Sequence, residues 1–366
     1  MSSLCILLLA TLAIQIIYFL AFLWSFAREG DERKGDPRPA TVLVCAHNEE
    51  SNLKELIPRL LEQNHPELEI VVVLDRTSDG SRLFLETAAG THKNLRCVDV
   101  PVVPAGVNGK KYGLLQGIRE AKHDILLLTD ADCRPGREWA SVMTSAFRRD
   151  TTIVLGYSPY LKTSGLLNTF IRFETLLTGI QYLGLARLGF PYMGVGRNLA
   201  YRKSFFTSTN GFDEIMTVTG GDDDLWVNRN ARAGHTRVQM GAASLVWSVP
   251  KTSWKDFLQQ KTRHLAAGLR YRPASRVLLG IFHASYVLSW LLFAVVLFLI
   301  SSIPLLIIIG FVGRLLLFTG LVIFASTRVG DKIPPWPVIL LDFLYVFYYL
   351  STALRALFTR TVRWTN

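Results

Sequence analysis

Long apolar segments without charged side chains lie near both ends of the chain. Leu4–Ser25 contains no charged residue, and three more apolar segments follow near the other end, over Leu278–Ile300, Pro304–Ala325 and approximately Trp336–Leu357. A helix of about 20 apolar residues is long enough to cross the hydrocarbon core of a bilayer. The pattern predicts an N-terminal transmembrane anchor over residues 1–27 and a transmembrane region over residues 276–366.

Basic residues after the first apolar segment predict its orientation. A cleaved signal peptide is the alternative, but the first five residues carry no positive side chain and no convincing cleavage site follows. Lys and Arg favour the cytoplasmic flank of a span, and the cluster here consists of Arg28, Arg33, Lys34 and Arg38. We expect a multi-pass protein of the cell membrane whose middle part lies in the cytoplasm.

Charged residues near the C-terminus constrain the apolar segments there. Arg314 lies inside one segment, where an exposed charge is costly, so we expect it to pair with Asp342. The alternative is that its long side chain reaches an interface. Four spans would place Arg355, Arg360 and Arg363 outside, so the last segment either lies in the interface or breaks the positive-inside tendency.

Residues 38–250 alternate between strand and helix patterns. The expected strands are Thr41–Ala46, Glu69–Leu74, Asn94–Val98 and Asp124–Thr129, and the expected helices are Glu50–Leu61 and Tyr112–Ala121. Alternation of this kind predicts an α/β domain with a parallel sheet and helices on both faces. Thr163–Met193 favours an amphipathic helix on the membrane surface or against the sheet. An interfacial amphipathic helix is expected over residues 251–275.

The composition favours a membrane protein with an anionic ligand. The chain has 366 residues, half of them hydrophobic, and a net charge of +11. This charge suits anionic headgroups or an anionic ligand, but the dense basic face of a nucleic-acid-binding protein is missing. The cysteines show no Cys-x-x-Cys or zinc spacing, so we expect reduced, packed thiols at Cys5, Cys45, Cys97 and Cys133.

Two aspartates follow the apolar run Asp124–Thr129. In an open α/β sheet the carboxyl ends of the strands form the ligand-binding edge, and Asp130 and Asp132 would lie there. Two carboxylates separated by one small residue can flank a hard cation such as Mg2+ or Mn2+. The alternative is a solvated loop after a strand, where Asp is common.

Further polar motifs follow in order along the chain. They are Val42-Leu-Val-Cys-Ala-His-Asn48-Glu49, Val73-Leu-Asp75-Arg76-Thr77, Gly109-Lys110-Lys111, Gly194-Val-Gly196-Arg197-Asn198, Thr219-Gly-Gly221-Asp222-Asp223-Asp224-Leu225 and Gln259-Gln260-Lys-Thr-Arg263-His264. Each motif is weak alone. Together with Asp130-Ala-Asp132, their order over residues 38–272 resembles the inverting, membrane-bound family 2 glycosyltransferases with a GT-A fold, which include cellulose, chitin and hyaluronan synthases and ceramide glucosyltransferase.

The resemblance implies an activity and its partners. It implies a cytoplasmic GT-A domain that moves a sugar from a nucleotide sugar, expected to be a UDP-sugar, to a lipid or a membrane-proximal glycan, with Mg2+ or Mn2+ as cofactor. Membrane lipids are expected partners and nucleic acids are not. A processive polysaccharide synthase is the alternative, and a non-catalytic membrane scaffold of the same descent ranks lower. The sugar, the acceptor and the oligomeric state stay open.

The resemblance also implies a role for each matching residue. Donor-binding residues would be Asn48, Glu49, Asp75, Lys110, Asp130 and Arg263, and the metal ligands would be Asp130 and Asp132. Acceptor-binding residues would be Gly196, Arg197, Asn198, Gln260 and His264. Arg76 and Thr77 replace the usual acid and glycine of the turn after Asp75, and His264 replaces a Trp. These departures leave the nucleotide base and the acceptor contact open.

The three consecutive aspartates would supply the catalytic base. Alignment on Leu225 places Asp222 in the base position, with Asp223 as the next candidate. Adjacent carboxylates are expected to raise one another's pKa, which suits a general base. The alternative is that these aspartates stabilise the first turn of a helix, and the two interpretations are compatible.

Overall fold

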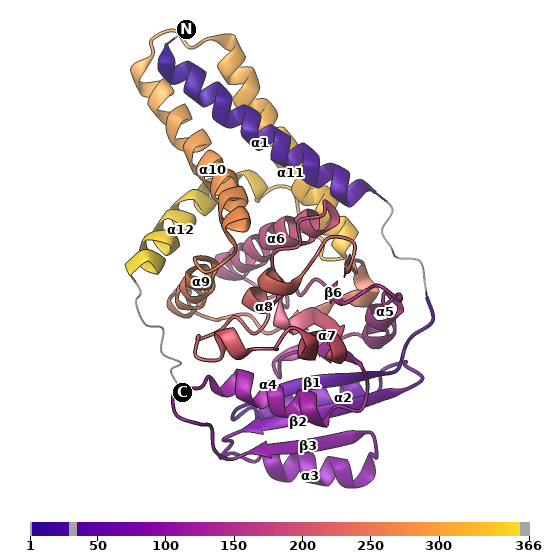
Figure 1. Ribbon diagram of the computed structural model, residues 1–366. Coiled ribbons are helices and arrows are strands. Elements are labelled where there is room, and N and C mark those ends of the chain that lie inside the picture. Colours follow the sequence, from indigo (N-terminus) through magenta and orange to yellow (C-terminus); the bar gives the residue numbers. More distant parts are fainter. Residues whose placement is uncertain (1, 29–34, 359–366) are drawn as a thin grey trace.

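The computed structural model describes residues 2–28 and 35–358, which form an α/β domain and a group of long apolar helices (Figure 1). The first apolar helix begins near the N-terminus and the other three follow the α/β domain along the chain. Four residues of the predicted basic clusters lie outside the described residues, namely Arg33, Lys34, Arg360 and Arg363.

A seven-stranded sheet forms the centre of the α/β domain, in the order β3-β2-β1-β4-β7-β6-β8. Its strands are β1 (Ala40–Ala46), β2 (Leu68–Asp75), β3 (Leu95–Val100), β4 (Ile125–Leu128), β6 (Ile153–Leu155), β7 (Leu199–Arg202) and β8 (Thr236–Val238). A separate pair consists of β5 (Cys133–Pro135) and β9 (Val246–Ser248). The four predicted strands are all present and stand side by side as β3, β2, β1 and β4.

The predicted strands form a parallel sheet, as expected, and a strand that was not predicted, β7, makes the complete sheet mixed. β1, β2, β3 and β4 run parallel, but β7 runs antiparallel to both β4 and β6. The direction of β7 follows from the connection between β6 and β7. Leu155 at the end of β6 pairs with Leu199 at the start of β7, so residues 156–198 leave and rejoin the sheet at the same edge and β7 runs back along β6. This edge is also the carboxyl edge of β4, which ends just before Asp130.

Helices cover both faces of the sheet, as predicted, because side chains alternate across each strand. On one face, Val42 and Val72 pack with α2 (Glu50–Leu61) in one core. On the other face, Leu43 and Val73 pack with α4 (Gly109–Glu120). The remaining helices of this domain are α3 (Ser81–Thr91), α5 (Trp139–Ser145), α7 (Lys203–Ser208) and α8 (Asp224–Asn230).

Two further helices lie between the sheet and the apolar helices. The first is α6 (Leu166–Arg187), which packs against α1 and β8 and is buried along most of its length, so the prediction of a helix against the sheet is confirmed. The second is α9 (Trp254–Gly268), which has a clear apolar face and packs against α12. All four cysteines are free thiols.

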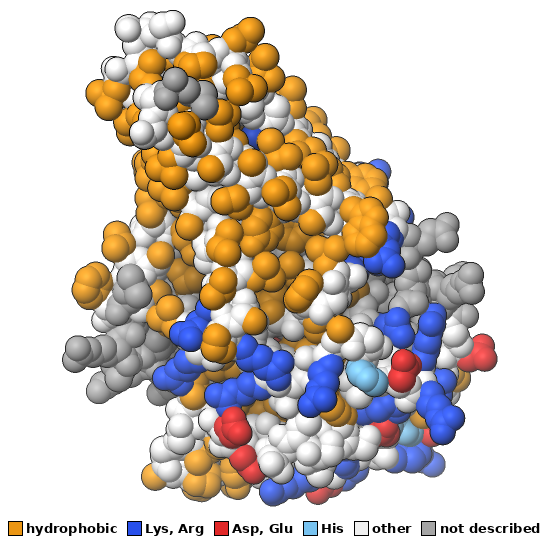
Figure 2. Space-filling model, turned by 45° about the horizontal axis from the view of Figure 1, so that its top comes forward, with side chains coloured by type: hydrophobic (Ala, Val, Ile, Leu, Met, Phe, Trp, Pro, Cys, Tyr) orange, Lys and Arg blue, Asp and Glu red, His pale blue; other side chains and the backbone are white. Residues whose placement is uncertain are grey.

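In the part of the chain that the structure describes, four helices are long and apolar enough to span a membrane. They are α1 (Ser3–Ala27), α10 (Pro273–Leu299), α11 (Leu305–Val329) and α12 (Val338–Phe358). Figure 1 shows α1, α10 and α11 side by side, while α12 runs from this bundle toward α9. Figure 2 shows a mainly apolar surface over the bundle, with Lys and Arg side chains gathered where it meets the α/β domain.

A buried ion pair joins two of these helices. Arg314 of α11 pairs with Asp342 of α12, and both side chains are fully buried, which confirms the predicted pairing. Tyr286 and Trp290 of α10 also donate hydrogen bonds to the Asp342 carboxylate. Three helices are therefore joined around one carboxylate inside the apolar bundle.

Candidate active site

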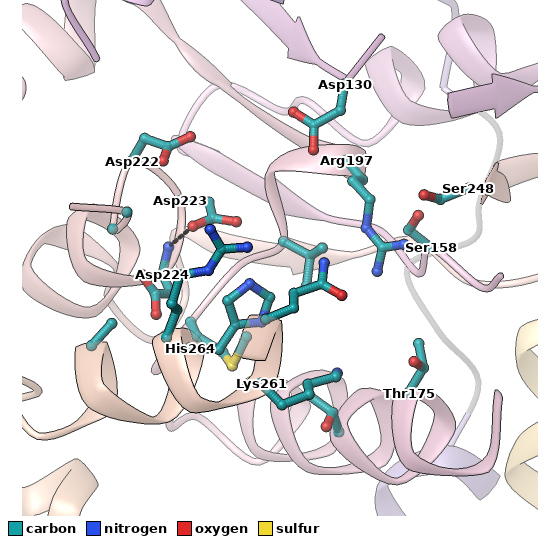
Figure 3. A pocket seen from close by; sticks show the side chains of 18 of the residues that line it. Asp130, Ser158, Thr175, Arg197, Asp222, Asp223, Asp224, Ser248, Lys261 and His264 are labelled. Carbon is teal, nitrogen blue, oxygen red and sulfur yellow. Dashed lines mark hydrogen bonds between the residues drawn. The ribbon is translucent and has the colours of Figure 1, made fainter. Parts of the chain in front are cut away.

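A cavity of about 240 Å³ lies at the carboxyl edge of β4, between the α/β domain and α9 (Figure 3). It brings together predicted residues from motifs that are far apart in the sequence. These are Lys110, Asp130, Asp132, Arg197, Asp222, Asp223, Gln260, Arg263 and His264. We refer to it below as the catalytic pocket.

Lys110 connects the two groups of aspartates. Its ammonium Nζ lies 3.0 Å from a carboxylate oxygen of Asp130 and 3.0 Å from one of Asp222. Burial alone would lower the pKa of Lys110, but the charges of Asp130 and Asp222 outweigh it and raise this pKa well above its ordinary value. Lys110 is therefore a fixed cation, and it stands between the predicted metal ligands and the predicted base.

The carboxylates of Asp130 and Asp132 fit a divalent cation. Burial and the negative charge of Asp130 raise the pKa of Asp132, so the two carboxylates repel each other and a cation between them would relieve this repulsion. Within residues 2–28 and 35–358 no group of three or more His, Cys, Asp or Glu side chains is placed to hold a metal. Mg2+ is commonly held by one or two carboxylates together with substrate phosphates, which is the mode this pair allows.

The three consecutive aspartates have three different environments. Burial opposes ionisation of Asp222, but Lys110 and Lys111 outweigh it and lower its pKa. Burial and the charge of Asp222 raise the pKa of Asp223 to about 6. Burial and the charge of Asp223 raise the pKa of Asp224 to about 8. The expectation that all three pKa values rise is therefore wrong for Asp222, because two lysines lie beside it.

The hydrogen bonds of the last two aspartates hold the pocket in shape. Asp223 caps α8 and accepts hydrogen bonds from the backbone N–H groups of Gly196, at 2.6 Å, and Asp224, at 2.7 Å. Asp224 is buried and accepts a hydrogen bond of 2.9 Å from the hydroxyl of Tyr271. Asp222, in contrast, faces Lys110, whose ammonium lies 3.0 Å from its carboxylate.

Lys111 belongs to the motif Gly109-Lys110-Lys111, but no role was predicted for it. Its side chain is fully buried, and its ammonium donates to the backbone carbonyls of Val218, at 2.5 Å, and Gly220. These carbonyls belong to the loop that leads into Asp222. Lys111 therefore positions this loop, while its neighbour Lys110 faces the pocket. The only sequence signal was its place beside Lys110.

The other side of the pocket carries cations and aromatic rings. The guanidinium of Arg197 lies over the ring of Tyr160, 4.3 Å from its centroid, and Gln260 donates to the Tyr160 hydroxyl at 3.5 Å. Figure 3 shows Lys261 and His264 reaching into the pocket from the side opposite Asp130. The side chain of His264 is exposed to the pocket, and the enclosing protein and nearby cations lower its pKa well below its ordinary value.

Several predicted donor residues lie outside the lining of this pocket. The carboxylate of Asp75 is held by Arg76, with Nε to Oδ1 at 2.7 Å and Nη2 to Oδ2 at 3.0 Å. Asn48 has a positive φ of 54° and accepts a hydrogen bond from the backbone N–H of Ser78. Glu49 accepts from the amide of Asn52. Asp75 still lies close to the pocket. A Cβ added at Gly109 would come within 2.6 Å of its carboxylate, and the next residue, Lys110, lines the pocket.

Two residues predicted to bind the acceptor have framework positions instead. Asn198 is fully buried, donates to the carbonyls of Tyr157 and Ser244, and accepts from the indole N–H of Trp139. A saturated, buried amide cannot contact an acceptor, so this prediction is corrected. Gly196 is also buried, and its N–H holds Asp223. The shared motif placed these residues beside Arg197, but only Arg197 of the three lines the pocket.

Comparisons with known proteins identify the fold and family. Residues 37–267 match the family described as glycosyltransferase like family 2. Mannosyltransferase PcManGT from Pyrobaculum calidifontis, solved in complex with GDP-Man and Mn2+, is 19% identical and aligns over 98% of this chain and 99% of its own, with a TM-score of 0.62. TarS from S. aureus, as residues 1–349 alone or with UDP-GlcNAc, is 15% identical over 89% of this chain and 93% of its own, with a TM-score of 0.45.

No curated protein matches the chain in sequence. The family match covers the whole α/β domain and α9, and the mannosyltransferase shares the GT-A fold. The catalytic pocket lies within the matched residues. The chain therefore belongs to glycosyltransferase family 2, and it is a nucleotide-sugar glycosyltransferase with a GT-A domain and four helices able to span a membrane.

Proposed function

We propose that this enzyme is an inverting transferase that adds one sugar to the hydroxyl of a lipid or membrane-proximal glycan. The observation that carries the proposal is the double contact of Lys110, at 3.0 Å from both Asp130 and Asp222. Lys110 therefore lies between two carboxylates with different proposed roles. Asp130 would hold the metal ion that binds the donor diphosphate, and Asp222 would accept the proton of the acceptor hydroxyl. A donor and an acceptor bound there would meet at the same point.

In this proposal Asp222 is the catalytic base. Its low pKa keeps it ionised, and the hydroxyl of the acceptor would give its proton to this carboxylate. The oxygen would attack the anomeric carbon from the side opposite the diphosphate, so the C–O bond to the diphosphate breaks and the anomeric configuration inverts. Asp223 is the less suitable base, because its carboxylate is already held by two backbone N–H groups.

The departing diphosphate would be stabilised by cations of the pocket. Arg263 of α9 lines the pocket, and a guanidinium can bind phosphate oxygens with two hydrogen bonds. Asp130 and Asp132 would hold Mg2+ or Mn2+, and such a cation, when bound, neutralises charge on the leaving group. PcManGT was solved with Mn2+, which supports a divalent cation at this site.

The nucleotide base would lie beside Asp75. We keep a UDP-sugar as the expected donor, because a carboxylate at the end of a strand can accept a hydrogen bond from a uracil N–H. Arg76 now occupies that carboxylate, so a bound base would have to displace or share it. Because PcManGT binds GDP-Man, a donor screen must include both UDP- and GDP-sugars.

A membrane acceptor is supported by the position of the pocket. Gln260, Arg263 and His264 come from α9, which packs against the apolar helix α12. A polymer synthase needs a broad aromatic platform for its growing glycan, and here His264 takes that place with a smaller ring that can hydrogen-bond a headgroup. One transfer per acceptor therefore fits better than polymerisation.

The test is a donor and acceptor screen. The detergent-purified enzyme is offered UDP- and GDP-sugars with Mg2+ or Mn2+, and nucleotide release is measured with and without a membrane lipid extract. We expect one donor class whose release is stimulated by the extract. Release that no lipid stimulates, for any donor, would contradict a lipid acceptor, and a metal-independent rate would contradict the roles of Asp130 and Asp132.

A further inference from the structure

A second cavity, of about 340 Å³, lies beside the catalytic pocket. The two cavities share four lining residues, namely Thr178, Met193, Lys261 and His264. The walls of the second cavity come from α6, α9, α10 and α12. We call it the lateral groove. It joins the catalytic pocket to two helices that are apolar enough to lie in a membrane.

The walls of the lateral groove are mainly aromatic and apolar. Tyr345, Tyr348 and Tyr349 of α12 line one side, and Leu279 of α10 lies on another. Such a surface suits a hydrocarbon chain, whose burial is favourable at roughly 0.8 kcal/mol per CH2. Leu269 in the wall is 49% exposed, so the groove reaches the surface of the molecule.

Most of the polar side chains that line the groove are paired within the protein. Lys261 forms an ion pair with Glu174, and Glu174 also accepts a hydrogen bond from the hydroxyl of Tyr348 at 3.1 Å. His283 is different. Its ring stacks on that of Tyr349 with centroids 4.2 Å apart, and its buried Nδ1 has no hydrogen-bond partner among the described residues. A buried polar atom of this kind is normally satisfied, which points to a polar group of a bound ligand.

We propose that the lateral groove is the binding site for the acceptor lipid. Its hydrocarbon chain would lie between α10 and α12, against the tyrosines, and its polar group would pass His283 and reach His264 at the junction with the catalytic pocket. This inference rests on the proposed function and adds the place and class of the acceptor. A water-soluble glycan is the less suitable occupant, because the groove runs along membrane helices and most of its polar side chains are already paired within the protein.

Two glycines allow the groove to be blocked without disturbing the fold. A Cβ added at Gly280 of α10 would meet no atom within 4 Å, and one at Gly268 of α9 would meet only Tyr271, at 3.7 Å. Both glycines line the groove. Gly280→Trp and Gly268→Phe would therefore fill it from two different helices, α10 and α9. Gly320 of α11 is the matched control, since it is an exposed helical glycine with nothing within 4 Å and lies outside the groove lining.

The experiment measures lipid transfer and donor binding separately. The enzyme in detergent is given a radiolabelled nucleotide sugar and a membrane lipid extract, and the label is counted after partition into organic solvent. Binding of the nucleotide alone is measured in parallel. We expect both groove variants to lose about tenfold or more of the lipid labelling, with nucleotide binding unchanged, while Gly320→Trp keeps both.

The outcomes separate this inference from the proposed function. Lipid labelling by Gly280→Trp and Gly268→Phe at the wild-type rate would overturn the groove as the acceptor site and leave the proposed function standing. Label from the wild-type enzyme that enters no lipid would overturn the lipid acceptor of the proposed function, and this inference with it. A loss of labelling in Gly320→Trp equal to that in the groove variants would also overturn the inference, because blocking the groove would not be its cause.

Discussion

At the scale of single residues, neighbours in the sequence have different chemistry because they face different surroundings. Asp222, Asp223 and Asp224 are chemically identical, yet the pKa of the first is lowered by lysines, and those of the other two are raised by burial and by the charge of the preceding aspartate. Lys110 faces the pocket, and Lys111 binds backbone carbonyls behind it. Asp222 is therefore the proposed base because of its surroundings, which lower its pKa and keep its carboxylate ionised.

The base assignment predicts the effect of one substitution. Asp222→Asn should lower the transfer rate by about a hundredfold to ten-thousandfold, the usual contribution of a general base, and leave donor binding nearly unchanged. Single-turnover transfer and nucleotide binding are the measurements. Asp223→Asn is the matched variant, and a dead Asp223→Asn beside an active Asp222→Asn would move the assignment by one residue.

The pH dependence distinguishes the same two carboxylates. A base works only when it is ionised, so kcat/KM is lost as the pH falls through the pKa of the base in the free enzyme. If Asp222 is the base, the acid limb lies below about pH 4, because its pKa is below the ordinary value for Asp. If Asp223 is the base, the limb lies near pH 6. The profile should be measured with circular dichroism at each pH as a control for folding.

At the scale of elements, α4 fixes the position of the aspartate loop. Gly117 lets α4 approach the sheet closely, since a Cβ there would come within 2.7 Å of Val73. Lys110 and Lys111 belong to the first turn of α4. The close packing of α4 on the sheet places this turn beside the loop that carries Asp222. The loop is thus held by a helix from a different motif, which a substitution in α4 can test.

Lys111→Met should destabilise this junction. The change leaves the carbonyls of Val218 and Gly220 without their buried donor, and we expect the free energy of unfolding to fall by roughly 2–4 kcal/mol. The exposed Lys54, which pairs with Glu50 on α2, is the control, and Lys54→Met should cost less than about 1 kcal/mol. Thermal unfolding in detergent measures both. Equal stability of the two variants would show that Lys111 does not hold the loop.

Sequence patterns were enough for α2, which has a periodic apolar face, and for β1, β2 and β4, which are continuous apolar runs. The bounds of α2 were predicted without error, and the strands of the parallel half of the sheet were found. The short strands β5 to β9 were missed, because three or four residues carry too little alternation to be distinguished from loops. The direction of β7 depends on where the long connection 156–198 returns, and no local pattern encodes that.

The candidate site was predictable as a set of motifs but less so in its detail. A motif shows which residues lie together, and nine of the predicted residues do line one pocket. It does not show which way each side chain points. Asn198 faces the core and Arg197 faces the pocket, although both belong to one motif. Tyr271, which binds Asp224, belongs to no motif and could not have been found.

At the scale of the whole molecule, the apolar helices are held together by a charged pair. Arg314→Leu would leave the carboxylate of Asp342 buried without its cation, and we expect a loss of about 3 kcal/mol or more. Arg314→Leu combined with Asp342→Leu removes both charges and should be less destabilised than Arg314→Leu alone. Thermal unfolding of Arg314→Leu, Asp342→Leu and the double variant in detergent provides the comparison. A double variant whose loss of stability equals the sum of the two single losses would argue against the pairing.

The whole molecule also places the catalytic pocket beside membrane helices. The pocket is lined by residues of α9, the lateral groove continues to α10 and α12, and Lys and Arg side chains gather where the apolar bundle meets the α/β domain (Figure 2). A donor from the aqueous side and an acceptor from the membrane could meet at Asp222 in this arrangement. The central claim is therefore a single transfer to a lipid.

One measurement tests that claim most directly. The wild-type enzyme and Asp222→Asn are incubated with a labelled nucleotide sugar, Mn2+ and a membrane lipid extract, and the products are separated by solvent partition and by size. We predict that the wild-type enzyme labels an organic-extractable lipid with one sugar of inverted anomeric configuration, and that Asp222→Asn does so far more slowly. Label in long water-soluble chains, or a retained anomeric configuration, would contradict a single inverting transfer to a lipid.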